Sequence, residues 1–142
     1  MSITGNYDTD NIFAKILRGE MPCVKVFESN HILAFMDVFP QSEGHTLVIP
    51  KSPCRNILDA GAKDLGRLIG TTQTLARAIH SALKPDGIVV TQFNGAPAGQ
   101  TVFHLHFHII PRYEGKALGA HGGDMADPDD LKAIADRIIA AL

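Results

Sequence analysis

Apolar residues recur along this chain with two periods, which predicts a mixture of helices and strands. Helical spacing marks three segments. The first follows the cap residues Asp10-Asn11 and ends at Gly19, the second covers about 58–83, and the third runs from Pro128 to Leu142 after the cap residue Asp127. Short apolar or alternating runs between turn residues mark strands at 24–28, 31–37, 45–49, 88–93 and from Phe103 to the closing Pro111. The order of these elements and their short connections predict an α+β fold with a mostly antiparallel sheet.

Composition fits one ordinary globular domain. The 142 residues are 45% hydrophobic and 20% charged, and no internal repeat or long linker divides them, so we expect a single domain over 1–142, with a core at 11–112 and a tail at 113–142. The net charge of -2 provides no overall attraction to nucleic acid or to an anionic membrane. We expect neither as a partner.

The start of the chain has no secretory pattern, and no apolar run approaches the roughly 20 residues that span a bilayer. Cys23 and Cys54 lie far apart and without metal-ligand spacing, which predicts reduced, buried thiols. We therefore expect a cytoplasmic protein.

Three of the seven histidines alternate with large apolar residues near residue 105. In a strand, His104, His106 and His108 would share one face, and the apolar residues between them would share the other. These apolar residues are Phe103, Leu105, Phe107 and Ile109. One face can therefore belong to the core, while the other carries three imidazoles, and His45 begins a further predicted strand.

Four interpretations of the histidine face remain open from the residues alone. The histidines can be solvated side chains, ligands of a metal ion, a catalytic group, or part of a nucleotide-binding or interaction module without turnover. No cysteine or carboxylate motif accompanies them to favour metal. A neutral imidazole can attack phosphorus and form a phosphoramidate, while neighbouring histidines orient it and donate to phosphate oxygens.

The sequence His104-Leu-His106-Phe-His108-Ile-Ile resembles the signature of the histidine-triad (HIT) family, in which three histidines alternate with apolar residues. The match extends upstream through Gly99-Gln100-Thr101-Val102, and the segment from Asp37 through His45 to Lys51 resembles another block of the family. The resemblance covers about 11–112. It implies a five-stranded antiparallel sheet with helices, and a homodimer.

By that resemblance, the protein is a hydrolase or nucleotidyl transferase acting at the α-phosphate of purine nucleotide conjugates. His106 would be the nucleophile, His104 would orient it, His108 would contact the α-phosphate, and His45 would be the fourth histidine. The further residues implied in substrate binding are Asp37 for the ribose, Ile12, Phe13, Phe35 and Val38 for the base, and Asn94, Gln100 and Thr101 for the phosphate and leaving group. The leaving group, an amine or a nucleotide, stays open, as does adenine against guanine.

Many bacterial members carry a Cys-x-x-Cys pair in the first helix that, with histidines placed like His45 and His104, binds a structural zinc ion. Here the matching positions are Asn11 and Ala14, which places the chain in a branch without that pair. We therefore expect no zinc and no cofactor.

Simpler interpretations accompany several of these residues. Asp37 can cap a turn, Asn94-Gly95 can be a turn on backbone grounds, and Arg112 can be a surface residue. His31 and His80 are expected at the surface or in packing. His121 is expected in a solvated loop within the segment 113–126, whose role the sequence leaves open.

Overall fold

The computed structural model describes residues 3–120 and 123–142, so the prediction for His121 lies outside the described residues. Nine elements follow in order: α1 (Ile12–Leu17), β1 (Lys25–Glu28), β2 (Ile32–Met36), β3 (Thr46–Pro50), α2 (Ala62–Leu83), β4 (Gly87–Thr91), the 3-10 turn η1 (Ala96–Ala98), β5 (Phe107–Arg112) and α3 (Pro128–Ala140). The strands form one antiparallel sheet in the order β1-β2-β3-β5-β4. The predicted α+β class and antiparallel sheet are confirmed.

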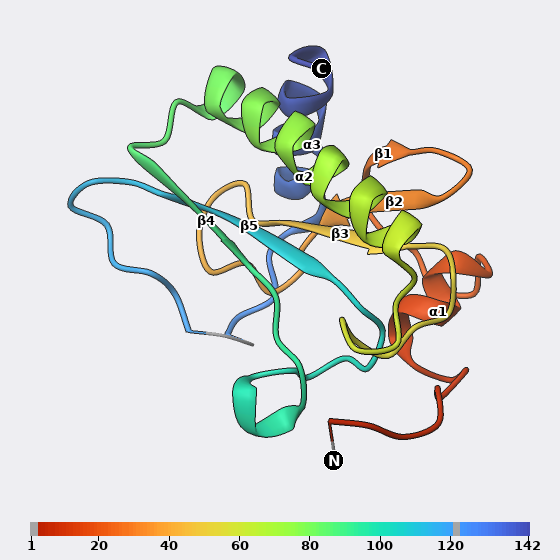
Figure 1. Ribbon diagram of the computed structural model, residues 1–142. Helices are drawn as coiled ribbons and strands as arrows, with labels where there is room; N and C mark the ends of the chain where they lie inside the picture. The colour runs from red at the N-terminus through yellow and green to blue at the C-terminus, as the bar shows by residue number, and fades with distance from the viewer. Residues whose placement is uncertain (1–2, 121–122) are drawn as a thin grey trace.

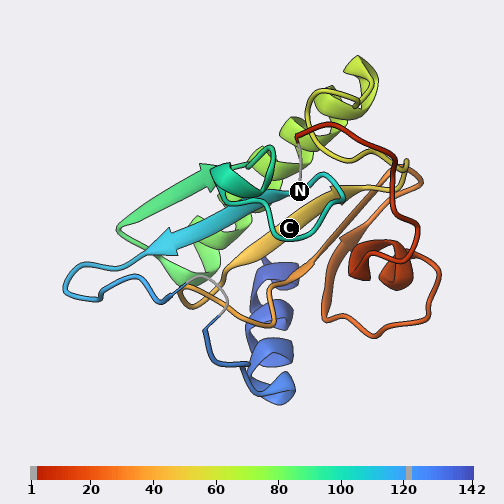
Figure 2. The same cartoon turned by 90° about the horizontal axis from the view of Figure 1, so that it is seen from below.

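Alternation along the strands separates two apolar layers. Ile32, Ala34 and Met36 of β2 face α2 and α3, which lie together on one side of the sheet (Figures 1 and 2). Leu33 and Phe35 face the other side and pack with Phe13 of α1. The histidine segment belongs to this arrangement, because Leu105, Phe107 and Ile109 pack into the layer below α2.

The predicted caps are confirmed at the two shorter helices. The Asn11 side chain accepts from the backbone N–H of Ala14 at 2.9 Å, and the Asp127 side chain accepts from Asp129 at 2.8 Å, directly before Pro128. Each bond satisfies a backbone donor that the first turn of a helix leaves open.

The long helix begins at Ala62, four residues later than predicted. The preceding segment is a turn in which the Asp59 carboxylate accepts from the backbone N–H groups of Arg55 and Asn56, each at 3.0 Å. The Asn56 side chain accepts from Leu58 at 2.9 Å, and Leu58 is exposed. Side chains that bond to nearby backbone groups compete with helix formation. The prediction that the helix begins near Leu58, which rested on the apolar period, was therefore wrong.

The histidine run is only partly a strand, which corrects the prediction. β5 begins at Phe107 and continues through Pro111 to Arg112, so Pro111 does not close it. Pro111 is tolerated because β3 pairs with β5 only as far as Ile109, and beyond that point β5 pairs with β4 alone. Upstream of Phe107 the chain leaves the ladder, and the ring of His104, rather than a backbone amide, donates to the Pro50 carbonyl at 2.8 Å.

The tail returns over the loop between β2 and β3. Gly119 donates its N–H to the Gln41 carbonyl at 2.7 Å, and the Gln41 side chain donates back to the Gly119 carbonyl at 3.2 Å. Cys54 is buried as predicted, whereas Cys23 is only half-buried, and neither forms a disulfide. Among the described residues, no helix combines the length and the apolar character needed to cross a membrane.

Candidate active site

In its neutral form, the imidazole of His106 carries its lone pair on the Nε2 atom. Its Nδ1 atom lies 2.7 Å from the carbonyl oxygen of His104, and a carbonyl can only accept, so the proton sits on Nδ1. The lone pair of Nε2 is therefore directed away from the backbone. The residue is 7% exposed, against 0% for His104, so of the two rings it is the one that retains some access to solvent.

His104 is buried and held at both ring nitrogens. Its Nε2–H donates to the Pro50 carbonyl at 2.8 Å, and its Nδ1 accepts from the hydroxyl of Tyr7 at 2.5 Å. Burial lowers the pKa of His104, although the bond to Pro50 opposes that shift. The ring is therefore neutral at physiological pH, with a defined tautomer.

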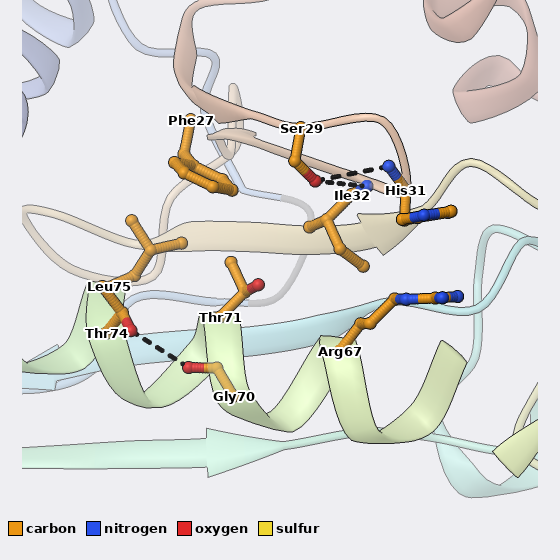
Figure 3. A pocket seen from close by; sticks show the side chains of 9 residues that line it. All are labelled: Phe27, Ser29, His31, Ile32, Arg67, Gly70, Thr71, Thr74 and Leu75. Carbon is orange, nitrogen blue, oxygen red and sulfur yellow. Dashed lines mark hydrogen bonds between the residues drawn. The ribbon is translucent and has the colours of Figure 1, made fainter. Parts of the chain in front are cut away.

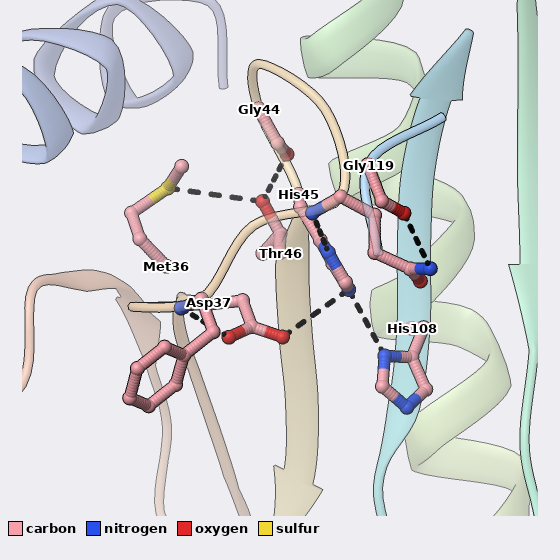
Figure 4. Close-up of polar contacts among 9 residues, drawn as sticks. Met36, Asp37, Gly44, His45, Thr46, His108 and Gly119 are labelled. Atoms are coloured by element: carbon pink, nitrogen blue, oxygen red, sulfur yellow. Dashed lines mark hydrogen bonds and ion pairs between the residues drawn. The ribbon is translucent and has the colours of Figure 1, made fainter. Parts of the chain in front are cut away.

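His45 and His108 share a further hydrogen bond, and the backbone fixes its direction (Figure 4). The N–H of Gln41 donates to Nδ1 of His45 at 3.0 Å, so His45 carries its own proton on Nε2. That Nε2–H donates to Nδ1 of His108 at 3.0 Å, with Asp37 Oδ2 also 3.4 Å away. His108 then carries its proton on Nε2, where it can be donated to a phosphate oxygen.

The histidines come together with aromatic rings around them. The ring centroids of His106 and His108 are 4.9 Å apart, and Phe13 stands edge-on to His106 at the same distance. Phe93 lies 5.4 Å from His108. Four histidines, one directly before β3, two in the segment before β5 and one in β5, therefore form one cluster on the α1 side of the sheet.

Asp37 lies beside this cluster and also caps a turn. Its Oδ1 accepts from the N–H of Phe39 at 2.8 Å, which confirms the turn interpretation. A carboxylate has about four acceptor positions, so the contact with ribose stays a prediction alongside the cap. Of the predicted base-binding residues, Phe13 and Phe35 are buried, while Ile12 and Val38 are exposed.

Gln100 and Asn94 hold loops together near the histidines. Gln100 is 2% exposed, and its side-chain amide donates to the carbonyls of Arg55 and Val102 and accepts from the N–H of Gly95. The Asn94 oxygen accepts from the N–H of Ile57 at 3.0 Å. Both side chains therefore brace the loops, and Thr101 is exposed; their contacts with phosphate stay predictions.

The residues present do not fit the structural zinc site. The Asn11 oxygen is used as a helix cap, Ala14 has no donor atom, and both ring nitrogens of His104 are hydrogen-bonded. The atoms of Asp37, His45 and His108 lie within 4.8 Å of one another and could geometrically hold an ion, but a hydrogen bond between the two rings accounts for their spacing.

A surface groove between the β1–β2 hairpin and α2 lies apart from the histidine cluster (Figure 3). Its lining includes His31, Arg67 and Leu75, and the Ser29 hydroxyl accepts from the N–H groups of His31 and Ile32. His31 is exposed, as expected for a surface residue. None of the predicted site residues lines this groove.

The sequence reasoning missed three partners of the cluster: Tyr7, the backbone N–H of Gln41 and the Pro50 carbonyl. Two are backbone groups, which no residue pattern identifies. Tyr7 lies 97 positions from His104, in a segment without apolar period, so no local signal indicated it.

Comparisons with known proteins identify the family of this chain. The model of the HIT domain matches residues 18–115. The chain is 41% identical to protein hit of Bacillus subtilis over 135 residues, covering 92% of this chain and 93% of that protein. It is 38% identical over 111 residues to a protein of Arabidopsis thaliana named adenylylsulfatase HINT3, covering 78% of this chain and 56% of that protein. A crystal structure of a Hit-like protein from Bartonella henselae superposes with a TM-score of 0.90 at 49% identity, covering 96% of this chain and all of that one.

Proposed function

We propose that this chain, which belongs to the HIT domain family, hydrolyses or transfers nucleotidyl groups of purine nucleotide conjugates of the adenosine 5'-phosphoramidate type. One observation carries the proposal: Nδ1 of His106 donates to the His104 carbonyl at 2.7 Å. This bond fixes the tautomer of the neutral ring in which the lone pair lies on Nε2, where it can attack phosphorus.

The reaction then has two displacements at the same phosphorus. His106 Nε2 attacks the α-phosphorus, the bond from phosphorus to the leaving amine breaks, and Thr101 or a histidine protonates the amine. Water then attacks the nucleotidyl-histidine, the bond between phosphorus and Nε2 breaks, and the nucleoside monophosphate leaves. The Nε2–H of His108 is suited to stabilise the charge on the phosphate oxygens.

Dinucleoside polyphosphates are the alternative substrates, because the same attack would expel a nucleotide. The name of the Arabidopsis relative, adenylylsulfatase, describes another leaving group on an adenylyl phosphorus. A comparison of kcat/KM for adenosine 5'-phosphoramidate, adenylyl sulfate and diadenosine triphosphate, with matching guanosine compounds, would rank the leaving groups and bases.

Mass spectrometry of the acid-quenched reaction tests the chemistry directly. We expect an adduct of one nucleoside monophosphate on His106 and a loss of turnover of at least about 10³-fold in folded His106→Gly. Full turnover in that variant would refute the mechanism. Tight nucleotide binding without product or adduct would instead support a binding module.

We also propose a homodimer located in the cytoplasm. The sheet order leaves β4 at an edge, where Val89 and Val90 are 39% and 45% exposed, and Ile69 of α2 is 53% exposed. An apolar edge strand favours pairing with a second copy. Light scattering of the purified protein would give the mass of a dimer, and a monomer at micromolar concentration would refute it.

A further inference from the structure

The hydroxyl of Tyr7 reaches the buried ring of His104 from the N-terminal segment. Nε2 of His104 faces the Pro50 carbonyl, which can only accept, so Nδ1 bears no proton and accepts from the Tyr7 hydroxyl at 2.5 Å. The two rings meet edge to face, with centroids 5.6 Å apart and planes at 69°. His104 therefore has a partner at each end of its ring.

The contact between Tyr7 and His104 is linked to the proposed nucleophile, His106, by one further hydrogen bond. The carbonyl of His104 accepts from Nδ1 of His106 at 2.7 Å, so the position of residue 104 sets the position and tautomer of the attacking ring. Phe13 packs against both rings, at 6.4 Å from His104 and 4.9 Å from His106. A shift of His104 would therefore move both the acceptor of His106 and the ring packed beside it.

Buried side chains hold the segment that carries Tyr7 in place. The Asn56 amide donates to the Ile3 carbonyl at 2.6 Å, and the Arg55 guanidinium donates to the Asn6 carbonyl at 3.4 Å. Asn56 is 1% and Arg55 4% exposed. Both views of the fold place this segment beside the 94–100 loop (Figures 1 and 2), and a Cβ added at Gly95 would lie only 3.3 Å from Cβ of Ile3. The N-terminal segment is thus fixed against the two loops that border the histidines.

We propose that Tyr7 is a positioning residue for the nucleophile and acts through His104. The inference rests on the proposed function, in which His106 attacks phosphorus. The Pro50 carbonyl sets the Nε2–H tautomer of His104, the Tyr7 hydroxyl holds the other end of the ring, and His104 in turn holds His106. Without that hydroxyl, Nδ1 of His104 is a buried acceptor that has lost its donor, and the ring can tilt about its remaining hydrogen bond to Pro50.

The variant Tyr7→Phe tests the hydroxyl alone, because it keeps the aromatic ring. Tyr113→Phe is the matched control, since the Tyr113 hydroxyl donates to the Glu43 carbonyl at 2.9 Å and lies outside the histidine cluster. We expect Tyr7→Phe to lower kcat for adenosine 5'-phosphoramidate about tenfold with KM within about twofold, because misplaced reacting groups slow chemistry more than binding. Tyr113→Phe should keep both values within about twofold.

Long-range ¹H–¹⁵N NMR of the imidazoles gives a readout that packing alone would not change. His104 should be in the Nε2–H tautomer in all three proteins, and the ¹⁵N resonance of its Nδ1 should move downfield, as expected when a nitrogen loses a hydrogen-bond donor, only in Tyr7→Phe. An Nδ1–H tautomer of His104 in the wild-type protein would overturn the proposal without any variant. Unchanged kcat together with an unchanged Nδ1 resonance in folded Tyr7→Phe would also overturn it.

The two proposals fail in different ways. Absence of a nucleotidyl adduct in the wild-type protein would refute the proposed function, whatever the state of His104. An adduct that forms at the same rate in wild-type and Tyr7→Phe protein would leave the function standing and refute the role of Tyr7. Quench-flow measurement of adduct formation therefore separates them.

Discussion

The Nε2–H of His45 donates to Nδ1 of His108 at 3.0 Å, and the backbone of Gln41 sets its direction by donating to the other nitrogen of His45. In the proposed mechanism, His45 therefore acts on phosphate through His108, whose proton it keeps on Nε2. When one residue acts through another, the losses of kcat caused by replacing each of them are not independent, because both replacements affect the same interaction.

We expect His45→Ala and His108→Ala each to lower kcat by roughly 10–100-fold, and the double variant to be about as slow as the slower single variant. Both changes act on the same donor to phosphate, the Nε2–H of His108, so their losses do not multiply. Steady-state kinetics with adenosine 5'-phosphoramidate measures this coupling. His31→Ala is the control, because His31 is exposed in the turn between β1 and β2, where it lines the surface groove apart from the histidine cluster. This variant should keep wild-type kcat. Fully multiplicative losses would show that His45 contacts substrate independently.

Burial of His104 predicts how stability depends on pH. Its pKa is lowered in the folded protein, so the unfolded chain binds a proton more readily as pH falls through about 6.5, the ordinary pKa of histidine. The contribution of the neutral, buried His104 to the free energy of unfolding is thus complete above that pH. Below it, this contribution decreases by at most about 1.4 kcal/mol per pH unit for one group. Urea unfolding at pH 5.0 and 7.5 should give a lower free energy of unfolding at pH 5.0.

The variant His104→Gln removes the titrating ring, so its stability should depend less on pH than that of the wild-type protein. His80→Gln, at an exposed position of α2, should keep the wild-type dependence. A wild-type pH dependence retained in His104→Gln would assign the effect to other groups.

Two glycines are expected to respond to alanine in opposite directions. Gly44 has a φ of +93°, and a Cβ there would overlap Leu83 Cδ1 and lie 3.2 Å from Pro111 Cγ, so Gly44→Ala should destabilise by about 1–3 kcal/mol. Gly66 lies within α2 with open space around it, so Gly66→Ala should stabilise by about 0.5–1 kcal/mol. Thermal and urea unfolding measure both, and a neutral Gly44→Ala would show that Leu83 moves aside at little cost.

The sequence predicted the fold well where local chemistry decides it. Apolar periods, together with Asn11 and Asp127 as caps, located the helices, and alternation placed Leu105, Phe107 and Ile109 in the core even though only two of them lie in β5. It failed where other hydrogen bonds, local or distant, compete with the apolar pattern. The first turns before α2 are held by Asp59, and the upstream part of the histidine run by Pro50. Which nitrogen of each histidine carries the proton depends on such partners, so the tautomers were beyond reach of the sequence.

The structure also bears on the prediction that the protein binds no structural zinc ion. The side chain of Asn11 caps α1, and the ring of His104 is hydrogen-bonded at both nitrogens, so a zinc ion would find no thiolate and would have to break one of the His104 hydrogen bonds to gain that imidazole. We therefore expect mass spectrometric metal analysis of the purified protein to find well below one zinc ion per chain. EDTA should leave both turnover and the melting temperature unchanged. One tightly bound zinc ion per chain, whose removal lowers the melting temperature, would contradict the prediction and would require the Tyr7–His104 hydrogen bond to open.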